Sequence, residues 1–336
     1  MQLVDTHCHI HESNYPLAPG EVLTRARQGG VGRVICVGTS QQSSCLALAF
    51  AAQHSGAFAA IGVHPHDTKD GWKEIFELVS FSGDSETKLA GEIPDNHSVV
   101  TSSRSSTTRQ GYLQPEPKAT SGPDFRPGAK PSLEGGGRRG EQNSEKQPAG
   151  PISIESYVKE GKQEKATQKL VAIGEIGLDY FYTHSPRDIQ IQALQEQIEL
   201  ALKYNLPIIF HVRDAFDDFW PIFDNFHGIR GALHSFTDTP TNLEQGLKRG
   251  LCIGVNGIST FTKDPNQQKM FASIPLARLL LETDAPFLTP IPLRGKINEP
   301  AFVRHVAEFQ ATIRGISVEE IAAATTANAH ALFALS

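Results

Sequence analysis

The sequence predicts an α/β fold, a (β/α)8 TIM barrel interrupted after its third strand by a long insert. Eight apolar, β-branched runs typical of buried parallel strands alternate with helical patterns along the chain. The chain has 336 residues, and 253 remain when the low-complexity stretch 83–165 is set aside, close to the ~250 typical of such a barrel. No strand is followed by a G-x-G-x-x-G or P-loop pattern, which counts against a doubly wound sheet.

Each expected strand is a short apolar run bounded by polar residues or a turn. This composition suits strands that are buried on both faces of a parallel sheet. In chain order the expected strands are Leu3 to His9, Arg33 to Val37, Phe58 to Val63, Leu170 to Glu175, Pro207 to His211, Gly231 to His234, Leu251 to Val255 and Leu279 to Glu282.

Helical patterns fill most of the intervals between the strands, and the clearest is SPRDIQIQALQEQIELALKYN. Ser185 is the expected N-cap, Pro186 fits the first turn, and Asn205 marks the end. The apolar face of this helix comprises Ile191, Leu194, Ile198 and Ala201. A strand followed by a helix, repeated along the chain, predicts a parallel barrel.

The stretch 83–165 differs in composition from the rest of the chain. It is rich in Ser, Thr, Gly and Pro and has almost no apolar periodicity, so we expect it to be disordered. It carries twelve acidic and twelve basic residues and is therefore not a charged arm suited to DNA. A solvated insert is favoured over a functional arm, and the domain prediction is a single barrel domain over 1–336 with this interruption.

Composition and charge exclude several classes of protein. A formal net charge of −6 and a pI near 6.1 count against a protein that coats nucleic acid through overall positive charge. The four cysteines are far apart without C-x-x-C spacing, which favours reduced thiols in the cytoplasm. No apolar run approaches the ~20 residues needed to span a bilayer, and we expect no membrane association and no protein partner.

Residues that can bind metal gather where the expected strands end. His7 and His9 lie two apart in LVDTHCHIH, so their side chains point to one face of an extended strand. The others are His64, His66, Glu175, Asp179, His211, His234 and Asp284. In a parallel barrel the carboxyl ends of the strands surround one mouth, where active sites are built. Taken alone, each residue has a structural alternative: a buried His bonded to backbone, a capping Asp or a salt-bridged Glu.

Taken together, these residues favour a metal centre. Without a metal, burying several imidazoles and carboxylates in one mouth would leave unpaired polar groups, at ~1–3 kcal/mol each. The ligands outnumber the four of a closed zinc site, so two divalent ions, Mg, Mn or Zn, account best for them. The predicted ligands are His7, His9 and Asp284 at one ion, His211 and His234 at the other, and Glu175 between the two. Such a pair can activate water and clamp a phosphoryl oxygen, and no G-x-S-x-G nucleophile motif competes.

Seven motifs, in order, resemble the TatD-type metal-dependent hydrolases, often called TatD family deoxyribonucleases. They are DTHCHIH, GVHPHD, AIGEIGLDYFY, FHVRDAF, LHSFT, LLLETDAPFLTP and PLRGKINEPAFV. The resemblance covers nearly everything except the insert. It implies a TIM-barrel phosphoesterase of the amidohydrolase group, with members acting as 3′-to-5′ exonucleases on DNA. It also implies that Glu175 and Asp284 bind the first metal with His7 and His9, and that Asp284 is the catalytic residue that accepts a proton from the attacking water. This chain departs from the usual pattern at Leu293 and Ser235, neither of them a metal ligand.

Substrate contacts are expected from cationic and aromatic residues near the mouth. Phosphate oxygens need fixed cationic donors, and Arg213 is the strongest candidate. The full set of predicted substrate-binding residues is His64, His66, Arg213 and Arg294. Phe181, Tyr182 and Phe236 follow metal-bearing strands and could stack bases, but core or loop packing is the favoured interpretation for each. Glu282 is expected to orient a ligand or to form a buried salt bridge, and Asp179 to brace the loop after strand four.

The leading hypothesis is a divalent-metal deoxyribonuclease that cleaves phosphodiester bonds at single-stranded ends with metal-activated water. One alternative is an amide or ester hydrolase with the same site, such as an aminoacyl-tRNA deacylase, because activated water also attacks carbonyl carbon. Another is a metal-binding scaffold without catalysis, which would be indicated by a broken ligand set. The set is complete here.

Overall fold

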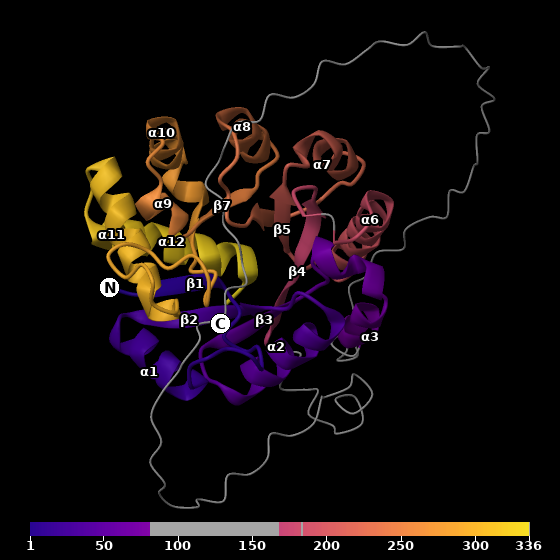
Figure 1. The fold of residues 1–336 in the computed structure, drawn as a ribbon, viewed down its shortest axis with the longest axis horizontal. Helices are drawn as coiled ribbons and strands as arrows, with labels where there is room; N and C mark the ends of the chain where they lie inside the picture. Colours follow the sequence, from indigo (N-terminus) through magenta and orange to yellow (C-terminus); the bar gives the residue numbers. More distant parts are fainter. Residues whose placement is uncertain (81–167, 183, 336) are drawn as a thin grey trace, which may run out of the picture. The chain divides into compact units, whose positions relative to one another are not determined.

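The computed structural model describes residues 1–80, 168–182 and 184–335. In this part of the chain eight parallel strands form one sheet, and their spatial order is their order along the chain (Figure 1). The strands are β1 (Leu3–Cys8), β2 (Val31–Val37), β3 (Ala57–Ile61), β4 (Leu170–Asp179), β5 (Ile208–Arg213), β6 (Gly231–Leu233), β7 (Cys252–Val255) and β8 (Leu279–Leu281).

The sheet closes on itself between its first and last strands. Cys8 forms a parallel bridge with Ala285, and the amide of Asp284 donates to the carbonyl of His7 at 2.9 Å. The hydroxyl of Thr6 donates to the carbonyl of Leu281 at 3.1 Å. The predicted TIM barrel is thus confirmed, because closure requires that the eighth strand meets the first.

Helices follow most of the strands and cover the barrel (Figure 1). They are α1 (Pro19–Gln28), α2 (Gln41–Gln53), η1 (Pro65–Asp70), α3 (Glu74–Ser80), α6 (Arg187–Lys203), α7 (Phe216–Phe223), α8 (Pro240–Lys248), α9 (Ile258–Phe261), α10 (Pro265–Ser273), η2 (Leu276–Arg278), η3 (Pro300–Phe302), α11 (Val303–Arg314) and α12 (Val318–Phe333). None of the helices in the described ranges is long and apolar enough to cross a membrane.

The apolar core has two parts, which follow from strands with two buried faces. Inside the barrel, Val4, Ile35 and Phe58 pack with side chains from the other strands and with Phe333 of α12. The larger part lies between the outer faces of the strands and the helices. Together they hold the strand ends in a rigid frame, which is what a site assembled from several strands requires.

The prediction for helix α6 was more accurate for its apolar face than for the residue at which the helix begins. Leu194, Ile198 and Ala201 are buried, whereas Ile191 is half-buried. The N-cap prediction for Ser185 is wrong: α6 begins at Arg187 without a side-chain cap. The Ser185 hydroxyl instead donates to the carbonyl of His66 at 2.7 Å, because the chain entering α6 packs against η1.

Strand β4 is longer than predicted and continues to Asp179. Glu175 was predicted to lie at the end of the strand, but it lies within the strand. The extension pairs with β5, with Gly177 opposite His211. The pairing is irregular between Ile173 and Ile176, which flank Glu175, and such irregularities re-aim side chains in strands.

The predicted disordered insert at 83–165 lies outside the described residues. The strands and helices above belong to one compact unit of the chain. The single-domain prediction stays a prediction.

Candidate metal centre

Six residues that the sequence analysis predicted as metal ligands lie close together at one end of the barrel. The alternation of β1 sends His7 and His9 inward, whereas the Cys8 thiol between them points outward to the carbonyl of Ile35 at 3.5 Å. The remaining four side chains come from β4, β5 and the segments that follow β6 and β8. They are Glu175, His211, His234 and Asp284.

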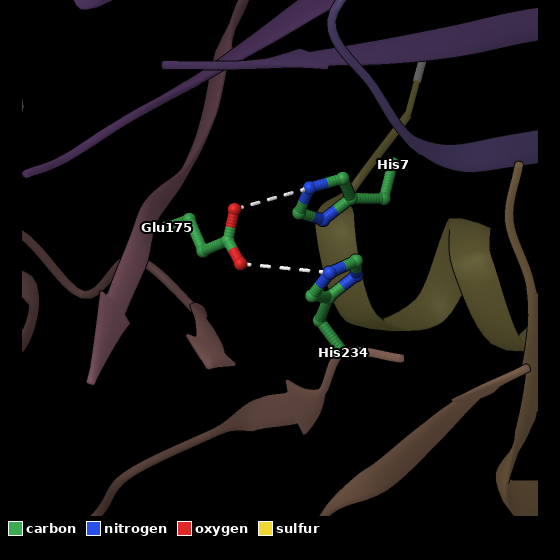
Figure 2. A group of neighbouring side chains, drawn as sticks. All are labelled: His7, Glu175 and His234. Carbon is green, nitrogen blue, oxygen red and sulfur yellow. Dashed lines mark ion pairs between the residues drawn. The ribbon is translucent and has the colours of Figure 1, made fainter. Parts of the chain in front are cut away.

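Glu175 lies at the centre of this group, and its two oxygens face different partners. Oε2 is 3.3 Å from Nε2 of His7. Oε1 is 2.9 Å from Nδ1 of His211 and 3.5 Å from Nε2 of His234. Figure 2 shows the carboxylate beside the rings of His7 and His234, with one oxygen toward each; the two rings are stacked with their centroids 3.6 Å apart.

A first donor group surrounds His7 Nε2. That atom is 3.1 Å from Nε2 of His9 and 3.7 Å from Oδ1 of Asp284, and His9 Nε2 is 3.3 Å from the same Asp284 oxygen. The Nδ1–H of His9 donates to the carbonyl of Val37 at 2.8 Å, which leaves the lone pair on Nε2 directed at the group.

A second donor group surrounds Oε1 of Glu175. Nδ1 of His211 and Nε2 of His234 both lie near this oxygen, and His234 also forms a group with His7 and Glu175. His64 also joins it, with Nε2 3.8 Å from Oε1, so this side chain lies close enough to be a ligand as well as a substrate contact. His66 does not contact Glu175 in the described contacts; its Nε2 lies 3.0 Å from Oδ2 of Asp179.

The electrostatics of the group favour a cation. Burial opposes charge on His211, but Asp179 and Glu175 outweigh it and raise its pKa to about 9. Burial likewise opposes charge on His234, yet Glu282 and Glu175 raise its pKa to about 10. Burial of Glu175 acts to raise its pKa, but the surrounding histidines lower it well below the usual value, so it is a carboxylate at neutral pH.

The donor set fits divalent metal. Ligands about 2.1 Å from one ion in tetrahedral geometry lie about 3.4 Å from one another. In the first group the separations of 3.1 to 3.7 Å span that value. Nε2 of His7 and Nε2 of His9 face each other, and two imidazole nitrogens in this arrangement have at most one proton to share. A shared cation satisfies both lone pairs.

Two further carboxylates hold the imidazoles of the second group. Glu282 places Oε1 3.0 Å from Nδ1 of His234 and accepts the amide of Ser235 at 2.6 Å. Asp179 places Oδ2 3.0 Å from Nε2 of His211, and its Oδ1 accepts the amides of Phe181 and Tyr182 at 3.0 Å each. Carboxylates behind metal-binding imidazoles orient the rings and raise their basicity.

Asp5 is a supporting residue that the sequence analysis missed. It is buried, and its carboxylate accepts the amide of Thr283 at 2.9 Å and the Thr283 hydroxyl at 2.6 Å. These bonds tie β1 to the segment that carries Asp284. The signal was available, because Asp5 precedes His7 by two residues and so shares its face of the strand.

The remaining predicted substrate residues lie outside the donor groups. The Arg213 guanidinium lies 3.8 Å from the centroid of the Phe181 ring, which is 52% exposed. Arg294 donates to the carbonyl of Thr289 at 2.8 Å. Phe236 is buried, which agrees with core packing, the favoured interpretation, and leaves no exposed ring for stacking.

Comparison with known protein families identifies relatives over nearly the whole chain. A family described as TatD related DNase matches residues 4–110 and 144–334. The chain is 30% identical over 336 residues to the uncharacterized metal-dependent hydrolase YabD of Bacillus subtilis, covering 99% of this chain and 100% of that protein. It is 39% identical over 173 residues to the 3′-5′ ssDNA/RNA exonuclease TatD of Erwinia amylovora, covering 49% of this chain and 67% of that protein.

Among solved structures, the TatD homologue YjjV of Escherichia coli superposes with a TM-score of 0.69 at 24% identity, covering 99% of this chain and 98% of that one. A TatD family hydrolase of Entamoeba histolytica gives a TM-score of 0.65 at 19% identity, again with 99% of this chain covered. These likenesses support the barrel fold. With the family match and the full-length relative, they show that this chain belongs to the TatD related DNase family and is a metal-dependent hydrolase.

Proposed function

We propose that the protein is a divalent-metal-dependent nuclease that hydrolyses phosphodiester bonds at free ends of single-stranded nucleic acid, preferably DNA in the 3′-to-5′ direction, with two metal ions. The observation that carries the proposal is the placement of Glu175. One of its oxygens faces His7 and the other faces His211, so Glu175 would be shared by two divalent ions held by these two sets of imidazoles.

The names of relatives support the nucleic-acid substrate. The protein of Erwinia amylovora and a second one of Citrobacter rodentium are both named 3′-5′ ssDNA/RNA exonuclease TatD. The Citrobacter protein is 36% identical to this chain over 178 residues. The choice of DNA is part of the proposal, since those names include both nucleic acids.

The family resemblance and the arrangement of the side chains support the following roles. His7, His9, Glu175 and Asp284 would hold the first ion, and Glu175, His211 and His234 would hold the second. Bound divalent ions supply Lewis-acid activation of water and of the phosphoryl group. Asp284 accepts the proton of the attacking water, since only one of its oxygens faces the imidazoles at under 4 Å among the described contacts.

Residues around the mouth then hold the strand. Arg213 supplies a cation near the second group, and His64, His66 and Arg294 are further candidates for phosphate contacts. The pairing of Arg213 with the exposed Phe181 ring presents a cation and an aromatic surface together, which suits a phosphate next to a base.

The test is release of nucleotides from 3′-labelled single-stranded DNA. Protein stripped with chelator is resupplied with Mg²⁺, Mn²⁺ or Zn²⁺, beside a His211→Ala/Asp284→Asn double variant of matched circular dichroism. The proposal predicts release that depends on metal and is at least a hundredfold slower in the double variant.

Folded protein that releases nothing with any of the three metals would overturn the nuclease proposal. Aminoacyl esters would then be the next substrates, since the same donor set can activate water against a carbonyl carbon.

A further inference from the structure

A pocket of about 330 Å³ opens directly beside the candidate metal centre. His9, whose Nε2 belongs to the first donor group, also forms part of the pocket lining. The other walls come from the loop after β1, the start of α2 and the segment after Asp284, which contributes Pro286 and Phe287. A group bound there would be adjacent to any bond held at the metal centre.

One wall of the pocket is an exposed aromatic ring. Phe287 is 57% exposed, although burial of such a ring stabilises a folded protein. Its position is fixed by the backbone, because its amide donates to the carbonyl of Asp284 at 2.8 Å. The chain therefore places an open aromatic face three residues from the proposed proton acceptor.

Polar side chains form another part of the pocket lining. Asn14 and Gln42 present exposed side-chain amides, which can both donate and accept hydrogen bonds. Glu12 adds a carboxylate, which accepts a hydrogen bond from the hydroxyl of Ser43. No Lys or Arg is among the residues that line this pocket. A second phosphate group would be repelled here, whereas a neutral ring with a hydrogen-bonding edge would be held.

We propose that this pocket binds the nucleobase of the nucleotide that adjoins the scissile phosphate, with the base stacked on Phe287 and its edge facing Asn14 and Gln42. The inference rests on the proposed nuclease function and names a binding subsite for it. Small-molecule sites occupy ~300–1,000 Å³, so a pocket of about 330 Å³ is large enough for one base with its sugar. A base whose edge faces Asn14 and Gln42 has no partner base, so the pocket would favour unpaired ends.

The test compares two single-stranded oligonucleotides of one sequence. One has intact bases, and the other carries abasic tetrahydrofuran units at the last two positions of both ends, so the result does not depend on the direction of cleavage. Cleavage of each oligonucleotide is measured with four metal-loaded proteins: the wild type, Phe287→Ala, Phe287→Trp and Ile291→Ala. Ile291 is the matched control, because it lies in the same segment, is 50% exposed and does not line the pocket.

Stacking of a base on an aromatic side chain is worth roughly ten- to a hundredfold in binding. We expect Phe287→Ala to lower kcat/KM on the intact strand at least tenfold, mainly through KM, and to leave the abasic strand within twofold of wild type. Phe287→Trp should retain activity on the intact strand, and Ile291→Ala should match wild type on both.

Two outcomes overturn the inference in distinguishable ways. If wild type cleaves the intact strand and Phe287→Ala cleaves it equally well, or loses activity equally on both strands, the subsite is wrong while the nuclease function stands. If wild type cleaves neither strand, the proposed function fails and the subsite fails with it. A melting temperature for each variant excludes misfolding as the cause of a loss.

Discussion

Replacing Glu282 by Gln tests whether a carboxylate behind an imidazole strengthens metal binding. Glu282 is buried directly after β8, with Oε1 3.0 Å from Nδ1 of His234 and 2.6 Å from the amide nitrogen of Ser235. Gln has the same shape and can still accept from that amide, but it brings no negative charge to His234. Burial lowers the pKa of His234, and Glu282 is the largest influence that raises it, to about 10.

Loss of such a partner lowers metal affinity about 10- to 100-fold, which corresponds to about 1.4–2.8 kcal/mol. We therefore expect the dissociation constant for Zn²⁺ to rise by that factor in Glu282→Gln. The assay is competition with a fluorescent zinc chelator, with circular dichroism and thermal melting to show that the variant is folded.

The matched control is Glu308→Gln. Glu308 forms an exposed ion pair with Arg304 at 2.9 Å on α11, and such pairs contribute little. It should bind Zn²⁺ like wild type. A dissociation constant for Glu282→Gln within threefold of wild type would refute the reasoning, because the carboxylate would then only hold the Ser235 amide.

Three further predictions follow from the described contacts. Arg213→Ala should raise KM for single-stranded DNA about tenfold and reduce the salt dependence of binding, measured by titration with NaCl; an unchanged salt dependence would remove Arg213 from the substrate path. His64→Ala should weaken Zn²⁺ binding if His64 is a ligand and should raise only KM for DNA if it is a substrate contact, so chelator competition beside kinetics decides between the two. A Cβ at Gly177 would lie 1.7 Å from the carbonyl oxygen of His211, whereas one at Gly20 would meet nothing within 4 Å. Gly177→Ala should therefore lower the melting temperature by more than 8 °C, roughly a 3 kcal/mol loss, while Gly20→Ala stays within 2 °C; similar melting temperatures would contradict the close approach of β4 to β5.

The eight strands could be predicted because their signals are local. Apolar β-branched runs such as that of β2 occur where a buried strand lies, whatever the rest of the chain does. The end of β4 was misplaced because IGLD carries no strong strand signal by itself and is held by pairing with β5. The cap of α6 was misassigned for a similar reason: Ser185 has a partner in His66, far away in the sequence.

The inward-facing residues of β1 could also be predicted from the sequence, since the alternation of side chains along a strand puts His7 and His9 on the same face. Asp5 obeys the same alternation and was overlooked because its partner, Thr283, lies at the other end of the chain. Phe236 shows that the exposure of a side chain after a strand could not be predicted. It follows a metal-bearing strand just as Phe181 does, yet only Phe181 is exposed, because loop paths are not encoded in strand order.

The sequence by itself determined the barrel, the family resemblance and the side chains that gather at the strand ends. Those features depend on periodicity and on motif order, which are properties of the linear chain. Only the tertiary structure decided that the two oxygens of Glu175 face different imidazoles, that Glu282 stands behind His234, and that Phe287 lines a pocket beside His9. These relations join residues far apart in the chain at separations of a few ångströms, and strand register and closure of the barrel set such separations.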